Sequence, residues 1–156
     1  MVALRPRIYQ LAKPQNSNSA SISPSTRPTS PTSALLDPEV PTPASLPGDF
    51  PVYPGARLVF RSPESEFELD LLWESLDSVD QVRAFYAGRL TQGDWTTFDQ
   101  EFDNGLYSVY FARKSDGGYG GAVTAGINAP GNLPADIPFL KRGITVIGVQ
   151  GLGKHT

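Results

Sequence analysis

The stretch Asp77–Leu90 constrains the fold most, because it has the pattern of an amphipathic helix with a defined start. Ser78 is a good N-cap, and Gln81 three residues later completes a capping box. The apolar residues recur at three- and four-residue steps and share one face: Val79, Val82, Phe85, Tyr86 and Leu90. Gly93 follows where a helix end favours left-handed backbone. Since so short a helix is marginal alone in water, the chain must supply a surface for it.

The segment before the helix predicts such a surface. Its residues alternate with the period of a strand: Phe67, Leu69, Leu71 and Trp73 on one face, and Glu66, Glu68, Asp70 and Leu72 on the other. We expect the first set to lie beneath the helix. The second set is almost wholly acidic and is expected to form a solvated outer face.

Five further strands are predicted, over residues 56–61, 96–102, 106–114, 121–128 and 144–149. Pro54-Gly55 suits a type II turn, and Asn104-Gly105 favours a tight hairpin. Residues 129–141 are interrupted by Pro and Gly and are expected to form a loop. The order β-β-α-β-β-β-β predicts an α+β fold, a two-layer sandwich with one helix on a mainly antiparallel sheet.

Residues 1–49 are predicted to be a disordered tail or tether, because Pro, Ser and Thr dominate residues 16–47. Two segments within it have alternative interpretations: Arg27–Pro31 as a docking peptide, and Ile8, Tyr9 and Leu11 as a short added strand or a partner contact. Residues 50–150 are expected to form the folded domain, and residues 151–156 a frayed C-terminal tail.

Composition excludes several classes of protein. The 156-residue chain has a formal net charge of −3, which argues against a general nucleic-acid binder. It contains no cysteine, so disulfides, thiolate metal sites, a cysteine nucleophile and a lipid-anchor cysteine are excluded. Its sequence shows neither a transmembrane segment nor a recognisable secretory signal.

Two features suggest contact surfaces. The run Glu64–Asp80 carries seven carboxylates and no Lys or Arg, which is typical of a solvated face or of a surface for a basic partner. The strand expected at residues 106–114 has aromatic side chains on both faces, with Tyr107 and Tyr110 on opposite sides. The candidate partner contacts are therefore Tyr107, Tyr110, Glu66, Glu68 and Asp70.

No motif points to a reaction, and we expect no catalytic, cofactor-binding or metal-ligating residues. The C-terminal Gly148–Thr156 resembles a phosphate-binding loop, but His155 stands where Ser or Thr is required. His155 is the only histidine, and is expected to be mobile near the C-terminus. The glycine-rich Gly117–Gly121 is expected to be a turn, because it lacks the basic and helical context of a phosphate cradle.

The chain resembles a small domain of uncharacterised bacterial envelope proteins and lipoproteins. The resemblance covers Phe50–Val149 and rests on Pro51–Ala56, on the helix residues Val82, Phe85, Tyr86 and Leu90, and on Gly93-Asp94-Trp95. It implies a structural domain behind a low-complexity tether and an extracytoplasmic or membrane-associated location. It implies no catalytic residue. The expected signal segment and lipid-attachment cysteine do not occur in this sequence.

These observations favour a non-enzymatic interaction module, an accessory or assembly subunit of a larger, membrane-associated bacterial complex, with a protein partner. The first alternative is an envelope ligand- or glycan-binding module that uses the aromatic face. The second is a hydrolase that uses a carboxylate pair from Glu66, Glu68, Asp99 or Glu101, held about 5–9 Å apart.

Overall fold

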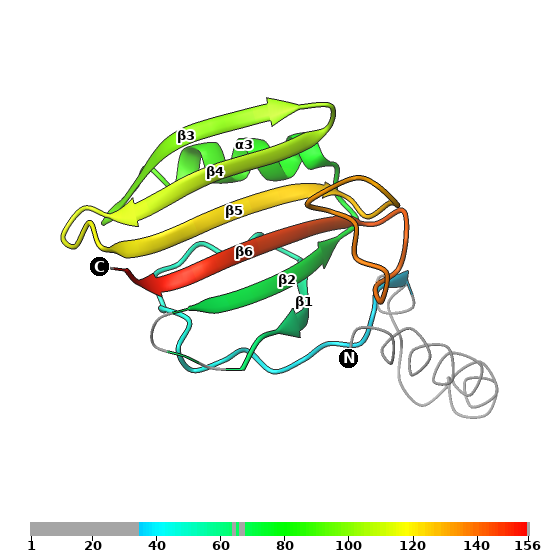
Figure 1. Ribbon diagram of the computed structural model, residues 1–156, viewed down its shortest axis with the longest axis horizontal. Helices are drawn as coiled ribbons and strands as arrows, with labels where there is room; N and C mark the ends of the chain where they lie inside the picture. The colour runs from blue at the N-terminus through cyan, green and yellow to red at the C-terminus, as the bar shows by residue number, and fades with distance from the viewer. Residues whose placement is uncertain (1–34, 64, 66–67, 156) are drawn as a thin grey trace.

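A computed structural model describes residues 35–63, 65 and 68–155. One antiparallel sheet dominates it (Figure 1), and the strand order across the sheet is β1-β2-β6-β5-β4-β3. The elements are β1 (Arg57–Arg61), β2 (Leu69–Ser75), α3 (Val79–Arg89), β3 (Trp95–Asp103), β4 (Leu106–Arg113), β5 (Tyr119–Ile127) and β6 (Thr145–Lys154). The predicted α+β class and element order are confirmed. The helix covers only part of one face, so the molecule is more sheet than two-layer sandwich.

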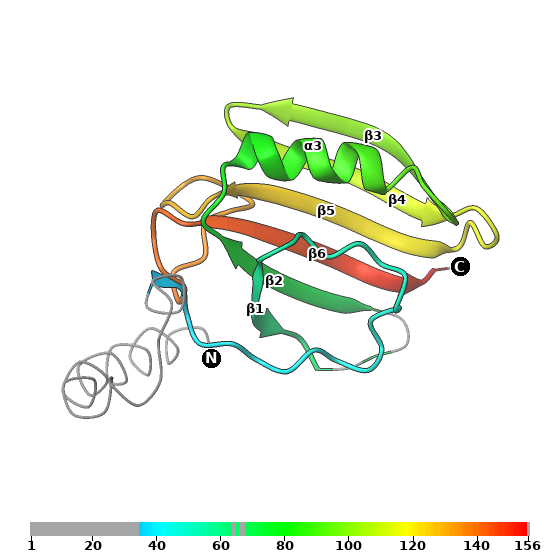
Figure 2. The ribbon, with the colours of Figure 1, turned by 180° about the vertical axis from the view of Figure 1, so that it is seen from behind.

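Helix α3 begins as the sequence predicts. The Ser78 hydroxyl accepts a hydrogen bond from the Gln81 amide, and the Gln81 side chain accepts one from the Ser78 amide. Leu90 forms the C-cap, and Gly93 has the expected positive φ a few residues later. The helix joins β2 to β3, the edge strand on the far side of the sheet, and lies along β4 and β5 on one face (Figure 2).

The main core lies between α3 and the sheet. The helix contributes Val79, Val82, Tyr86 and Leu90, all of them buried, and β2 contributes Leu69, Leu71 and Trp73. These β2 side chains belong to the same buried cluster as the helix residues, although the helix itself contacts mainly β5 and β4. Phe67 lies outside the described residues. Phe85 is only half-buried, because it lies at the helix flank with its ring edge-on to Tyr53 at 5.1 Å.

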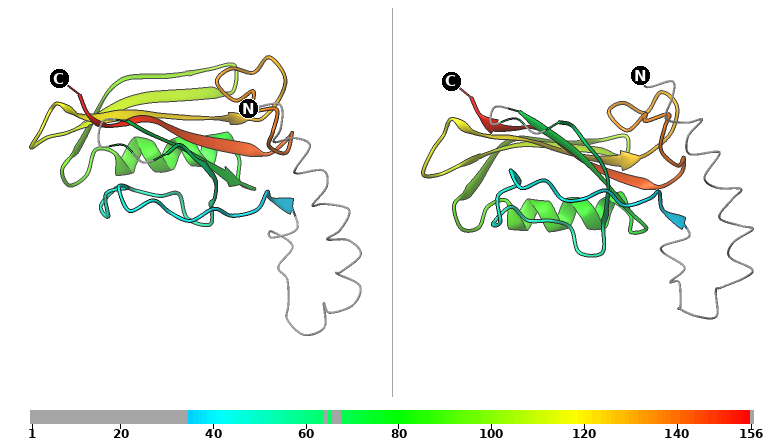
Figure 3. Two further views of the ribbon diagram at one scale, coloured as in Figure 1. Left: turned by 60° about the horizontal axis from the view of Figure 1, so that its bottom comes forward. Right: turned by 90° about the horizontal axis from the view of Figure 1, so that it is seen from below.

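Residues 35–50 cover part of the same face as the helix (Figure 3). Leu36 and Phe50 are buried, and the Val40 amide donates to the Leu58 carbonyl on β1. This part of the Pro-rich segment is thus packed on the domain. Residues 1–34, where the rest of the tether is predicted, lie outside the described residues.

Strand β3 contains an irregularity that the sequence did not predict. Between Phe98 and Glu101 the pairing with β4 shifts by one residue, and Asp99 has a φ of 52°. Such a bulge reverses the alternation of side chains between faces. Phe98 therefore lies on the face away from α3, whereas Phe102 lies under Arg83 of the helix. The next turn is as predicted, since Asn104 and Gly105 both have positive φ.

Strand β6 is longer than the predicted 144–149. It pairs with β5 as far as Lys154, and the His155 amide donates to the Gly118 carbonyl at 2.5 Å. The His155 ring Nε2 also lies 2.6 Å from the Gly151 carbonyl oxygen. The expectation of a frayed end with a mobile histidine is therefore wrong for residues 151–155, because backbone pairing holds them.

The loop between β5 and β6 folds over one end of the sheet on the face away from α3. The buried Asn128 organises it: its amide nitrogen donates to the carbonyls of Ile137, Leu140 and Lys141, and its oxygen accepts from the Ile137 amide. Ile137 and Leu140 pack there with Val59 and Val146 in a second apolar cluster.

Arg113 joins three parts of the chain on the helix face. Its guanidinium binds the Asp49 carboxylate with two hydrogen bonds of 2.8 and 2.9 Å and reaches Asp94 at 3.2 Å. It also lies 4.2 Å from the centre of the Trp95 ring. These contacts lower the pKa of Asp49 below its usual value, chiefly through the hydrogen bond from Arg113.

We expect Arg113→Met to lower the Tm by roughly 5 °C, because the segment around Asp49 loses its paired attachment. Arg113→Lys keeps the charge but cannot form two parallel bonds, and should have an intermediate effect. Thermal unfolding at low and high salt measures both. A Tm unchanged in both variants would show that the ion pair does not hold the segment.

Candidate functional site

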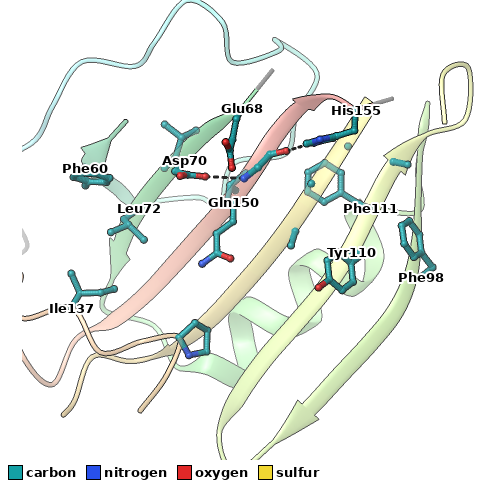
Figure 4. Close-up of a pocket in the computed structure, with 18 of the residues that line it drawn as sticks. Phe60, Glu68, Asp70, Leu72, Phe98, Tyr110, Phe111, Ile137, Gln150 and His155 are labelled. Carbon is teal, nitrogen blue, oxygen red and sulfur yellow. Dashed lines mark hydrogen bonds between the residues drawn. The ribbon is translucent and has the colours of Figure 1, made fainter. Parts of the chain in front are cut away.

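The candidate site is the sheet face opposite α3, here called the open face (Figure 4). A shallow groove of about 920 Å³ crosses it from β1 to β3. Phe60 and Leu72 line it on the β1–β2 side, and Tyr110 and Phe98 on the β4–β3 side. The floor between them carries small residues of the central strands, such as Gly120 and Ala122. These small residues leave room for a ligand between the bulky sides, next to the exposed side chain of Gln150, which also lines the groove (Figure 4).

Phe98 and Tyr110 form the most exposed aromatic pair of the groove. They are register partners on β3 and β4, and their rings stack at 5.9 Å with an interplanar angle of 16°. Each residue is 51% exposed. Exposed paired rings on a sheet are typical of contacts with proteins or sugars. The bulge at Asp99 is essential here, since it decides which β3 side chains face the groove.

Glu68 and Asp70 lie at the β2 side of the groove, as Figure 4 shows. Glu68 is exposed. Asp70 is partly held by the sheet, because its carboxylate accepts a hydrogen bond from the Gly151 amide at 2.8 Å. Asp136, on the covering loop, is paired with Arg142 at 2.9 Å. No Lys or Arg belongs to the described residues that line the groove, so its charge favours neutral or basic ligands.

The structure separates the other residues that the sequence suggested as partner contacts. Tyr107 points to the helix side and is fully buried, with its hydroxyl donating to Gln100 at 2.8 Å. It is therefore a core residue and not a contact, because β4 alternates and Tyr110 takes the open side. Glu66 lies outside the described residues.

Of the carboxylates of the hydrolase alternative, Glu68 lines the groove, Asp99 and Glu101 do not, and Glu66 lies outside the described residues. Glu68 lies beside β2, while Asp99 and Glu101 lie on β3. In the strand order four inter-strand spacings separate β2 from β3. At about 4.8 Å each, they place the two sides roughly 19 Å apart, well beyond the spacing that glycoside chemistry needs. Among the described residues no group of three His, Asp or Glu side chains is arranged to hold a metal.

A buried carboxyl pair, which sequence reasoning missed, lies at the covered end of the sheet. Asp37 and Glu74 are 3% and 0% exposed, and the Asp37 amide donates to Glu74 Oε1 at 2.7 Å. The Asp37 carboxylate in turn accepts from the Lys141 amide at 2.8 Å. Burial, together with the side-chain hydrogen bond to Asp37, raises the pKa of Glu74 to about 8. Burial thus favours the neutral form of Glu74, and its hydrogen bond with Asp37 fastens the start of the described chain to β2.

Comparison with known proteins adds nothing to this description. No protein-family model, curated protein or solved structure matches the chain. No helix in the described residues has the length and apolar character needed to cross a membrane. The open face with its aromatic pair is therefore the feature on which a function can be built.

Proposed function

We propose that the chain is a non-enzymatic interaction module, an accessory or assembly subunit that binds a protein partner through the open face. The supporting observation is the stacked, half-exposed pair Phe98 and Tyr110 beside a floor of small residues. Aromatic side chains dominate the energetics of protein interfaces, where they fill the centre of the contact.

The charge of the groove supports a partner with apolar and basic side chains. Glu68 and Asp70 line one side, and no Lys or Arg lines any described part of the groove. A segment with apolar and basic side chains complements this surface, whereas an acidic segment would be repelled. The resemblance to envelope domains suggests that the partner belongs to a membrane-associated bacterial complex.

The test compares purification of the full chain with that of two variants from native membranes and soluble extract. We expect wild-type protein to recover a partner in stoichiometric amount, and Phe98→Ala/Tyr110→Ala to recover at least about tenfold less, equivalent to about 1.4 kcal/mol. Phe102→Ala is the matched control, because Phe102 is an exposed aromatic of the same strand under the helix Arg83. Equal recovery by all three proteins, or recovery of a free monomer only, would count against the proposal.

Glycan binding is a second candidate, and the same aromatic pair favours it. Sugar rings bind by stacking on exposed aromatic faces, and the Phe98 and Tyr110 rings are both half-exposed. A glycan array probed with wild-type protein, with the double variant and with Phe102→Ala distinguishes it. Specific sugar binding that is lost only in the double variant would show that the ligand of the open face is a glycan and not a protein.

A further inference from the structure

We infer that residues Arg5–Lys13 of the same chain occupy the open face in the absence of a partner. The inference rests on the proposed function, because it makes the partner site self-occluded. In this segment the basic side chains Arg5, Arg7 and Lys13 are interspersed with Ile8, Tyr9 and Leu11. A segment that combines apolar and basic side chains complements the aromatic and acidic lining of the groove.

Charge distribution along the chain supports this occupant. Residues 1–34 carry four basic side chains and no acidic one, whereas all sixteen acidic residues lie at position 37 or beyond. The open face presents Glu68 and Asp70 without a Lys or Arg among its described lining. A basic segment attached to an acidic domain is attracted to it over about 10 Å at ordinary salt.

The connecting chain is long enough. The described chain begins at Leu35, next to the loop that covers one end of the open face (Figure 1). The 21 residues 14–34 span roughly 25 Å as a coil and up to about 65 Å when extended. The open face measures roughly 33 Å along its longest strand and about 24 Å across six strands. Every part of the groove is within reach.

Attachment also lowers the affinity that is needed. A segment joined by a linker of this length experiences an effective concentration in the millimolar range. A contact with a dissociation constant of about 1 mM would therefore occupy about half of the molecules. A partner must displace the segment and binds correspondingly more weakly.

The test places the photo-crosslinking residue p-benzoylphenylalanine at position 110 of the full chain, with the same residue at the exposed helix position Ala87 as the control site. We expect an intramolecular cross-link from position 110 to residues 5–13, found by mass spectrometry of the monomer, and none from position 87. A mixture of isotopically light and heavy chains identifies links between two copies. Such links, or the absence of any link to residues 5–13, would overturn the inference.

Charge reversal provides the matched comparison. Arg5→Glu/Arg7→Glu/Lys13→Glu should reduce the cross-link severalfold and raise the apparent affinity for the partner by up to about twofold, measured as recovery at limiting partner concentration. Arg27→Glu lies in the connecting chain and should change neither. If the partner still binds through Phe98 and Tyr110 but the triple variant recovers no more of it, the self-occlusion fails while the proposed function stands. If the monomer shows no such cross-link and no partner is recovered, both proposals fail.

Discussion

Replacing Glu74 with glutamine is expected to abolish a loss of stability that the wild-type domain shows between pH 5 and pH 9. Burial raises the pKa of Glu74 from 4.5 to about 8, so the folded state holds a proton that the unfolded chain releases. The contribution of Glu74 to the free energy of unfolding is therefore greatest below pH 4.5. It falls as the pH rises to about 8 and changes little at higher pH. The size of the loss is on the order of a few kcal/mol.

Glutamine cannot ionise and keeps an oxygen for the Asp37 amide, so the variant should be the more stable protein at pH 9. Denaturant unfolding at pH 5, 7 and 9 measures this, with the exposed Glu101→Gln as the control. The carboxylates Asp49 and Asp136 have lowered pKa values, chiefly from hydrogen bonding, and so act in the opposite direction and only at acidic pH. A wild-type protein equally stable at pH 5 and pH 9 would show that Glu74 is not buried as a neutral acid.

Tyr86→Ala is expected to lower the free energy of unfolding by about 3–5 kcal/mol, because it removes the largest side chain that the helix buries. Tyr86→Phe should cost nothing and could stabilise the domain by up to about 1 kcal/mol. The reason is that the buried Tyr86 hydroxyl has no hydrogen-bond partner among the described residues.

Fluorescence of the two buried tryptophans, Trp73 and Trp95, reports unfolding for both variants. If the phenylalanine variant loses as much as the alanine variant, the hydroxyl must make a strong bond in solution. If the alanine variant loses less than about 1 kcal/mol, the helix does not depend on this contact with the sheet.

Local sequence was enough to predict the elements whose chemistry is local. The capping box at Ser78 and Gln81 and the Asn104-Gly105 turn depend on neighbours within a few residues, and both are confirmed. The end of β6 was missed because the glycine-rich residues 151–156 were expected to fray, whereas pairing with β5 holds the segment extended. Tertiary pairing overrode local propensity there.

The candidate site was only partly predictable for a related reason. Alternation in residues 106–114 places Tyr107 and Tyr110 on opposite faces, but it cannot say which face the helix covers. The bulge at Asp99, which turns Phe98 onto the open face, has no turn residue to mark it. Asp37 and Glu74 are separated by 37 positions, so their burial together depends on the path of residues 35–50.

The two outer strands of the sheet also bear on solubility. Val40 pairs with β1, and β3 interrupts its own outer edge with a bulge and the exposed acids Asp99, Glu101 and Asp103. Unpaired flat edges recruit further strands, and charges and bulges prevent this. The domain can therefore keep aromatic rings in water without sheets of neighbouring molecules pairing edge to edge into fibrils.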